Sequence, residues 1–214
     1  TDVSAERIRD ELVKLFTGHR SGQGLTFLDD SGLLKGVLPE VERMKGVAQP
    51  PEFHPEGDVF THTKILLDQL KTPSAILAFG ALLHDVGKPP TFRVADRIRF
   101  DGHDRVGATI TRAVCRRLRF SNAEPESIVK LVADHMKFKD VRQMRLSTLK
   151  RFMSAATFLE ELKLHRADCL ASHGDLSHYE FCKDELNRQS DVSLRPAPLI
   201  TGDDLIAMGL APGP

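Results

Sequence analysis

The stretch that decides the fold is Ala75-Ile76-Leu77-Ala78-Phe79-Gly80-Ala81-Leu82-Leu83-His84-Asp85-Val86-Gly87-Lys88. It follows Pro73, which suits a first helical turn, it is apolar almost all the way round, and it stops at Gly87 before two prolines. This pattern predicts a buried central helix whose last turn carries His84 and Asp85. Burying an imidazole and a carboxylate side by side is costly unless something satisfies them. A divalent metal would do so, and so would a structural role for the pair at the helix end.

Four further side chains that commonly bind metals lie along the chain, each on or beside a different predicted helix. They are His62, His103, His135 and Asp168. The series His, His-Asp, His, His, Asp resembles the HD metal-dependent phosphohydrolase superfamily over residues 58–173, and the doublet followed by Val-Gly-Lys is the most specific part of the match. The resemblance implies one metal held by four residues: His62, His84, Asp85 and Asp168. In superfamily members with two metals, the histidines corresponding to His103 and His135 help to hold the second.

Composition limits the possible partners and compartments. Lys plus Arg equals Asp plus Glu at 30 each, so any surface for a polyanion must be local. Two basic runs are the places to look, although each could simply be a solvated helix face: Arg112, Arg116, Arg117 and Arg119, and then Lys137, Lys139, Arg142, Arg145, Lys150 and Arg151. The three cysteines show no Cys-x-x-Cys spacing, which suits small core residues in a reducing cytoplasm. No stretch has the pattern of a membrane or secretory segment.

Apolar spacing predicts an all-α chain in three parts. Residues 1–45 form a short neck-like helical segment, residues 58–190 a helical bundle with the metal site, and residues 191–214 a tail with a short helix over 199–210. The proline-containing segment 45–57 reads as a loop between the first two parts.

The helices are expected at particular places. Ser4 should cap the first one, Gly22 and Gly24 should loosen the turn that follows it, and Gly32 and Gly36 should break the next two. Within the bundle we expect a helix after Asp58, the central helix, a short hairpin in 93–101, and helices near 102–118, 125–136, 147–153, 158–172 and 176–189.

The flanks of the bundle resemble a more specific family. Glu6-Arg7-Ile8-Arg9-Asp10-Glu11-Leu12, Asp30-Ser31-Gly32-Leu33-Leu34 and Leu38-Pro39-Glu40-Val41 are similar to the neck of bacterial CCA-adding tRNA nucleotidyltransferases and related poly(A) polymerases. Leu199-Ile200-Thr201-Gly202-Asp203-Asp204-Leu205 and the last residues resemble the C-terminal region of the same family. Members often carry an HD domain between these two regions.

The chain departs from that family at its catalytic head. The Gly-Ser turn and Asp-x-Asp carboxylates that perform nucleotide addition have no counterpart, since Asp29-Asp30 and Asp203-Asp204 are adjacent pairs without a glycine-rich turn before them. We therefore expect no nucleotidyl transfer from this chain alone. Because it begins at Thr1, we expect a fragment or a processed product.

A metal held in this way suggests phosphate-ester hydrolysis, because a bound ion both acidifies water and neutralises the phosphoryl group. We expect Asp85, Lys88, His103 and His135 to be catalytic, and Lys88, His103, Arg105, His135 and Arg166 to contact the substrate. For Lys88, a helix C-terminal charge is an equal alternative. The sequence does not distinguish Mn, Fe, Co, Ni, Zn or Mg. We predict one tightly bound ion, with His103 and His135 as phosphate contacts or a weak second site.

Three functions remain open from the sequence. The first is a phosphohydrolase acting on phosphomonoesters or 2′,3′-cyclic nucleotide ends, linked to tRNA 3′-end processing. The second is a tRNA-binding body with a structural or vestigial HD site, and the third is a dimerisation module that would form a homodimer.

Overall fold

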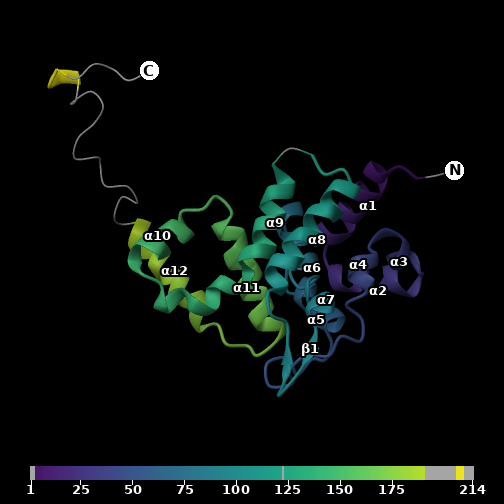
Figure 1. Ribbon diagram of the computed structural model, residues 1–214. Coiled ribbons are helices and arrows are strands. Elements are labelled where there is room, and N and C mark those ends of the chain that lie inside the picture. Colours follow the sequence, from purple (N-terminus) through teal and green to yellow (C-terminus); the bar gives the residue numbers. More distant parts are fainter. Residues whose placement is uncertain (1–2, 122, 191–205, 210–214) are drawn as a thin grey trace.

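The computed structural model describes residues 3–121, 123–190 and 206–209 (Figure 1). Its helices are α1 Ala5–Thr17, α2 Ser21–Asp30, α3 Leu33–Val37, α4 Pro39–Glu42, α5 Val59–Asp68, α6 Ala75–Leu83, α7 Lys88–Thr91, α8 His103–Arg117, α9 Glu124–Asp134, the 3₁₀ segment η1 His135–Gln143, α10 Leu146–Met153, α11 Phe158–Ala171 and α12 Ser177–Ser190. A two-stranded antiparallel hairpin, β1 Arg93–Val94 and β2 Ile98–Arg99, is the sole sheet in these residues. The predicted all-α class is confirmed.

The central helix α6 is buried as the sequence predicts. The Ser74 hydroxyl caps it by accepting a hydrogen bond from the Leu77 amide at 3.1 Å, and all residues from Leu77 to Leu83 are buried. It contacts α1, α5, α9 and α11, so helices from both ends of the chain pack around it (Figure 1).

The helix α6 ends at Leu83, about one turn earlier than predicted. Residues 84–87 form tight turns in which the Val86 amide bonds to the Leu83 carbonyl at 3.1 Å and the Lys88 amide to the Asp85 carbonyl at 2.9 Å. Prolines 89 and 90 have no amide hydrogen with which to continue an α-helical ladder, and α7 starts as a separate short helix. His84 and Asp85 therefore lie in a turn that follows the buried helix.

Glycines allow this turn to lie directly against α8. A Cβ added at Gly87 would stand 2.0 Å from the His103 carbonyl oxygen and 2.6 Å from the Gly107 amide nitrogen. Real Cβ atoms do not approach backbone atoms so closely, so only glycine fits at this position. The close approach brings the first residue of α8, His103, next to the His84-Asp85 turn.

The N-terminal helices follow the sequence prediction in part. Ser4 caps α1, and Gly32 separates α2 from α3 in a left-handed conformation. The expectation that Gly22 and Gly24 loosen a turn is wrong, because both lie inside α2. Added Cβ atoms there would meet the Lys64 carbonyl of α5 at 2.1 Å and the Leu15 side chain of α1 at 2.7 Å, so these glycines allow close helix packing. Gly36 likewise lies within α3 and does not break it.

Two hydrophobic cores hold the described residues together. The larger one includes Leu12, Phe16, Phe79 and Leu131, so α1–α4 pack into the same core as α5, α6 and α9. The smaller core joins η1, α10, α11 and α12 through residues that include Phe138, Phe152 and Phe158. The loop at 45–57 therefore does not separate two cores, although the predicted division into domains remains a prediction.

Other predicted features have mixed outcomes. All three cysteines are buried, as expected of core residues. Of the predicted helix over 199–210, only Ile206–Gly209 falls within the described residues, where it forms one turn. None of the described helices has both the length and the apolar character needed to cross a bilayer.

Candidate metal centre

Four side chains that the sequence assigns to one metal meet in the structure. His62 comes from α5, His84 and Asp85 from the turn after α6, and Asp168 from α11. The Nε2 atom of His62 lies 3.0 Å from Asp168 Oδ1, and the Nε2 atom of His84 lies 3.1 Å from Asp85 Oδ2. His62, His84 and Asp85 are each at most 2% exposed. We call these four residues the tetrad.

The other two predicted histidines share Asp85 with the tetrad. The Nε2 atoms of His103 and His135 lie 3.6 and 3.8 Å from Asp85 Oδ1 and 3.1 Å from each other. They come from the first residue of α8 and the first residue of η1. Asp85 thus stands between two groups of ligands, and six residues far apart in the sequence form one cluster.

The imidazole rings are held so that their Nε2 atoms face the cluster. The Nδ1 atoms of His84, His103 and His135 lie 2.8, 2.8 and 2.7 Å from the carbonyl oxygens of Ala81, Phe100 and Val132. A carbonyl oxygen only accepts, so in each ring Nδ1 carries the hydrogen and Nε2 of the neutral form keeps a lone pair. Such an outer partner is the usual companion of a histidine that binds a metal.

Three residues near the cluster are not among the site residues that the sequence predicts, and all lie in the loop predicted over residues 45–57. Glu56 Oε1 lies 2.6 Å from His62 Nδ1 and 2.9 Å from His54 Nδ1, and the third residue, Gln49, contacts Lys88. The segment is tied at its base, because the Gly46 amide bonds to Asp58 Oδ2 at 2.6 Å and the Val59 amide to the Val47 carbonyl at 3.1 Å. His54 also packs edge-on against the His62 ring, with 5.0 Å between the ring centroids, and the nearest ligand atoms of His54, Glu56 and His62 lie within 4.8 Å of one another.

Lys88 points into the site. Its Nζ atom lies 2.7 Å from Asp85 Oδ2 and donates a hydrogen bond to Gln49 Oε1 at 2.6 Å, and the side chain is almost fully buried. The ammonium also lies over the Phe100 ring, 5.3 Å from its centroid. The position agrees with the alternative in which Lys88 serves the site, since its charge balances the Asp85 carboxylate.

Charges within the cluster shift several pKa values. Burial lowers the pKa of His62, but the contacts with Asp168 and Glu56 outweigh burial and raise that pKa to about 9. Burial and the nearby His84 lower the pKa of His135 to about 4, so this ring is neutral at pH 7. Burial alone would raise the pKa of Asp85, but His84 and Lys88 hold it well below its usual range. A metal would therefore meet ionised Asp85 and neutral His135, and would displace the proton of His62.

The tetrad has the chemistry that a divalent ion requires. His62 Nε2 and Asp85 Oδ2 are buried and, despite their close neighbours, make no hydrogen bond of acceptable geometry. Ligand atoms of His62, His84 and Asp168 lie within 4.8 Å of one another, as do those of Asp85, His103 and His135. Two imidazoles and two carboxylates suit a borderline or hard divalent cation. The donors present therefore fit a metal.

The contact between Glu56 and His62 leads to a prediction. We expect Glu56→Gln to weaken Mn²⁺ binding by about 10-fold or more, the usual effect of removing a carboxylate that orients a histidine ligand. Isothermal titration with Mn²⁺ would measure this. Glu52→Gln is the matched control, because Glu52 lies in the same loop with an exposed side chain and should bind Mn²⁺ as the unaltered chain does. Equal affinities for all three proteins would contradict a role for Glu56.

Two residues predicted to bind substrate are not joined to the cluster by a hydrogen bond or ion pair within the described chain. Arg105 is exposed on α8, two residues after His103. Arg166 lies over the Tyr179 ring of α12, with its Cζ atom 5.9 Å from the centroid. It precedes Asp168 by two residues and so stands on another side of α11. The structure thus supports a packing role for Arg166, and a substrate contact by either arginine remains a prediction.

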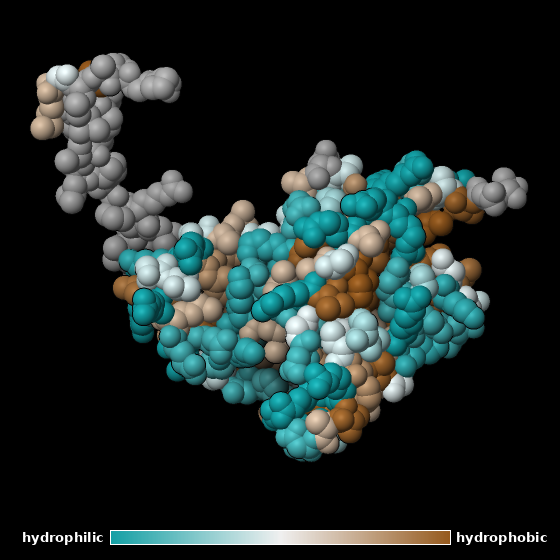
Figure 2. All heavy atoms as spheres, viewed as in Figure 1, coloured by the Kyte–Doolittle hydropathy of each residue, from teal (hydrophilic) through white to brown (hydrophobic). Residues whose placement is uncertain are grey.

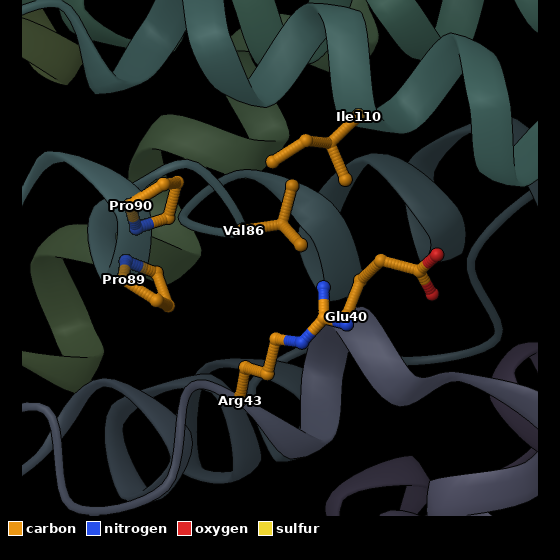
Figure 3. Close-up of a pocket in the computed structure, with 6 residues that line it drawn as sticks. All are labelled: Glu40, Arg43, Val86, Pro89, Pro90 and Ile110. Carbon is orange, nitrogen blue, oxygen red and sulfur yellow. The ribbon is translucent and has the colours of Figure 1, made fainter.

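A separate pocket of about 390 Å³ is lined in part by chain neighbours of the cluster residues, but its lining differs from the cluster in chemical character (Figure 3). It is lined by Glu40, Arg43, Val86, Pro89, Pro90 and Ile110. Val86 and Pro89 are the chain neighbours of Asp85 and Lys88, yet none of the six cluster residues lines the pocket. Its walls are mainly apolar, so this pocket lacks the groups needed for hydrolysis.

Comparisons with known proteins agree with both resemblances seen in the sequence. Residues 58–172 match the family model described as the HD domain, and residues 1–45 match the model described as a probable RNA and SrmB-binding site of polymerase A. The A-adding tRNA nucleotidyltransferase of Deinococcus radiodurans is 34% identical over 98% of this chain and 51% of the relative. The CC-adding tRNA nucleotidyltransferase of Thermus thermophilus is 34% identical over 98% of this chain and 49% of the relative.

A third relative matches a shorter part. The multifunctional CCA protein of Methylococcus capsulatus is 36% identical over 67% of this chain and 34% of the relative. The chain thus spans about half the length, or less, of the curated relatives that it matches.

Proposed function

The chain belongs to the HD-domain family, and we propose that it is a metal-dependent phosphohydrolase acting on phosphomonoesters or 2′,3′-cyclic phosphates at RNA ends. The observation that carries this proposal is the convergence of six ligand side chains with their histidine Nδ1 atoms already bonded. The similarity to tRNA nucleotidyltransferases supports a role in tRNA 3′-end processing.

We propose that the tetrad holds one tightly bound divalent ion. Its four ligands are two imidazoles and two carboxylates, whereas His103 and His135 have only the shared Asp85 to balance a second charge. A bound ion would lower the pKa of a coordinated water from about 15.7 toward 7 and neutralise a phosphoryl group. The second group is then a phosphate contact or a weaker metal position.

The chain's own residues have separate tasks in this proposal. Asp85 joins the two ligand groups and carries the negative charge that they share. Lys88 lies against Asp85 and, with three N–H groups, can also donate to a phosphate oxygen. His103 and His135 present Nε2 atoms beside Asp85, where an imidazole can accept or return a proton.

The proposal is tested by assaying the purified chain with Mn²⁺, Ni²⁺, Co²⁺ or Mg²⁺. We expect turnover of bis(p-nitrophenyl) phosphate and of 2′,3′-cyclic AMP with at least one of these ions, and its loss on adding EDTA. The His84→Ala variant should lose the activity. No turnover with any ion, or turnover that His84→Ala leaves intact, would remove the hydrolase proposal.

The alternative is an RNA-binding body whose HD site is structural. The match of residues 1–45 to an RNA-binding region favours RNA binding, and this is compatible with hydrolysis. A purely structural site does not by itself explain why ligand atoms from five separate segments of the chain gather around Asp85, His62 and Asp168.

A further inference from the structure

A strong local charge lies on η1 and α10, although the chain as a whole is neutral. Residues 137–151 contain six cationic side chains and a single acidic one, Asp140, whereas the chain has 30 basic and 30 acidic residues. We call these fifteen residues the basic segment. It begins two residues after His135 and lies outside residues 1–45, the part that matches an RNA-binding family model.

Four of the six cations have no ion-pair or hydrogen-bond partner for their side chains within the described residues. Lys137 pairs with Asp134 at 2.8 Å, and Arg142 donates to the Ser177 carbonyl at 3.0 Å. The other four have exposed side chains, for which the described residues provide no ion pair or hydrogen bond: Lys139, Arg145, Lys150 and Arg151. In Figure 2, hydrophilic spheres cover much of the region that α10 and α12 occupy in Figure 1.

The first basic run of the sequence behaves differently. Three of the four arginines in this run have acidic partners. Arg112 pairs with Glu126 at 3.0 Å, Arg117 with Glu40 at 2.6 Å and Arg119 with Glu6 at 2.6 Å. Those side chains fasten α8 to its neighbours. Three arginines of that run are thus committed to ion pairs within the chain, whereas the basic segment concentrates like charges that repel each other until an anion binds.

The helix α10 is well placed to present its cations. Leu149, Phe152 and Met153 anchor it in the smaller core, which leaves Lys150 and Arg151 on the exposed side. Phe138, Phe152 and Phe158 are buried in that core, and the partly buried rings of Phe181 and Tyr179 already lie under Arg142 and Arg166, so these rings are not free for bases to stack on. A surface with free cations and no stacking platform recognises phosphates rather than bases.

The basic segment leads away from the metal centre. η1 starts at His135 in the cluster and runs for 9 residues. With a rise of about 2 Å per residue, it extends at most about 18 Å. This length matches roughly five phosphates at about 3.4 Å per nucleotide of one strand.

We propose that the basic segment is a contact surface for the phosphate backbone of RNA, and that it holds a strand whose end reaches the metal centre. The surface acts without sequence preference and adds to any contact made by residues 1–45. The proposal that the bound strand ends at the metal centre rests on the proposed hydrolase function. The proposal that this surface binds RNA does not depend on that function.

The test compares two charge-reversed variants of the full chain. Lys150→Glu/Arg151→Glu changes the basic segment, and Lys71→Glu/Lys183→Glu changes net charge equally at exposed lysines elsewhere. We measure binding of a tRNA transcript by filter retention from 50 to 300 mM NaCl. We expect the first variant to bind about 10-fold more weakly at 50 mM, with a salt slope smaller by about two, and the control to change less than 2-fold.

The outcomes separate this proposal from the hydrolase proposal. Equal weakening by both variants, or none by either, would overturn the RNA surface. The proposal would also fail if the unaltered chain bound phosphatidylserine vesicles but not tRNA, and Lys150→Glu/Arg151→Glu weakened that vesicle binding. Metal-dependent turnover of bis(p-nitrophenyl) phosphate should be the same in all three proteins, because none of the changed residues lies in the cluster. If turnover is absent from all three while tRNA binding changes as expected, only the hydrolase proposal fails.

Discussion

Asp85→Asn is expected to abolish tight metal binding and to reduce metal-dependent hydrolysis by at least about 10³-fold. The Asp85 carboxylate faces both ligand groups, with Oδ2 at 3.1 Å from His84 and Oδ1 at 3.6 Å from His103. The amide is nearly isosteric but carries no charge to attract a cation. A metal contributes several kcal/mol to phosphoryl chemistry, which corresponds to about three powers of ten in rate.

The same substitution should also destabilise the fold, for a different reason. Lys88 is buried and pairs with Asp85 at 2.7 Å, so Asp85→Asn leaves a buried ammonium without its counter-charge. Loss of one partner from a buried ion pair costs about 3 kcal/mol, or a fall in Tm of about 6–12 °C for a chain of this size.

A double variant separates the two effects. In Asp85→Asn/Lys88→Met both charges are removed, so the thermal stability should return toward that of the unaltered chain while metal binding and turnover stay absent. Calorimetry and Mn²⁺ titration on the three proteins give the comparison. If the double variant regains metal binding, or if Asp85→Asn alone binds Mn²⁺ normally, Asp85 does not have the role assigned to it.

Gly87→Ala is expected to lower stability by about 3 kcal/mol and to disturb one half of the site. The new methyl carbon would stand 2.0 Å from the His103 carbonyl oxygen, a backbone atom that cannot rotate away. The turn and α8 must therefore separate, and His103 must withdraw from Asp85. Because the tetrad does not include His103, we expect Mn²⁺ affinity to change little while turnover falls at least 10-fold.

Gly36→Ala is the matched control for this steric argument. Gly36 lies in the helix α3, where an added Cβ would have no atom within 4 Å. The alanine should be neutral or should stabilise the chain by about 0.5–1 kcal/mol, because it reduces the freedom of the unfolded state. Thermal melts of both variants decide the matter, and a Gly87→Ala variant as stable as Gly36→Ala would show that the turn can move away from α8 at no cost.

The sequence predicts the elements that carry strong patterns. The apolar run before His84 predicts a buried helix because no exposed helix is apolar on every side, and the structure has that helix. The ligand series predicts His62, His84, Asp85, His103, His135 and Asp168 as a set, and they converge. A sequence pattern does not determine which bonds these residues form with a metal or a substrate, so those bonds remain a proposal.

Other features leave no periodic signal. Glu56 and Gln49 lie in a proline-containing loop, and only the folded chain shows that this loop returns to His62 and Lys88. Glycine weakens isolated helices, so the sequence predicts that Gly22 loosens a turn, whereas its close approach to Lys64 involves a helix more than forty residues away. Arg166 is close to Asp168 in sequence, yet the helix directs it to Tyr179. Close packing and loop position arise from distant contacts, which local propensity does not encode.

The most direct measurement is anomalous diffraction from crystals of the chain grown with Mn²⁺, recorded above and below the manganese absorption edge. The account predicts one fully occupied ion bounded by His62, His84, Asp85 and Asp168, with weaker or no density beside His103 and His135. Two fully occupied ions less than about 4 Å apart, the spacing of two-metal sites, would contradict the single tight ion. A fully occupied ion elsewhere, with none at the tetrad, would contradict the site itself.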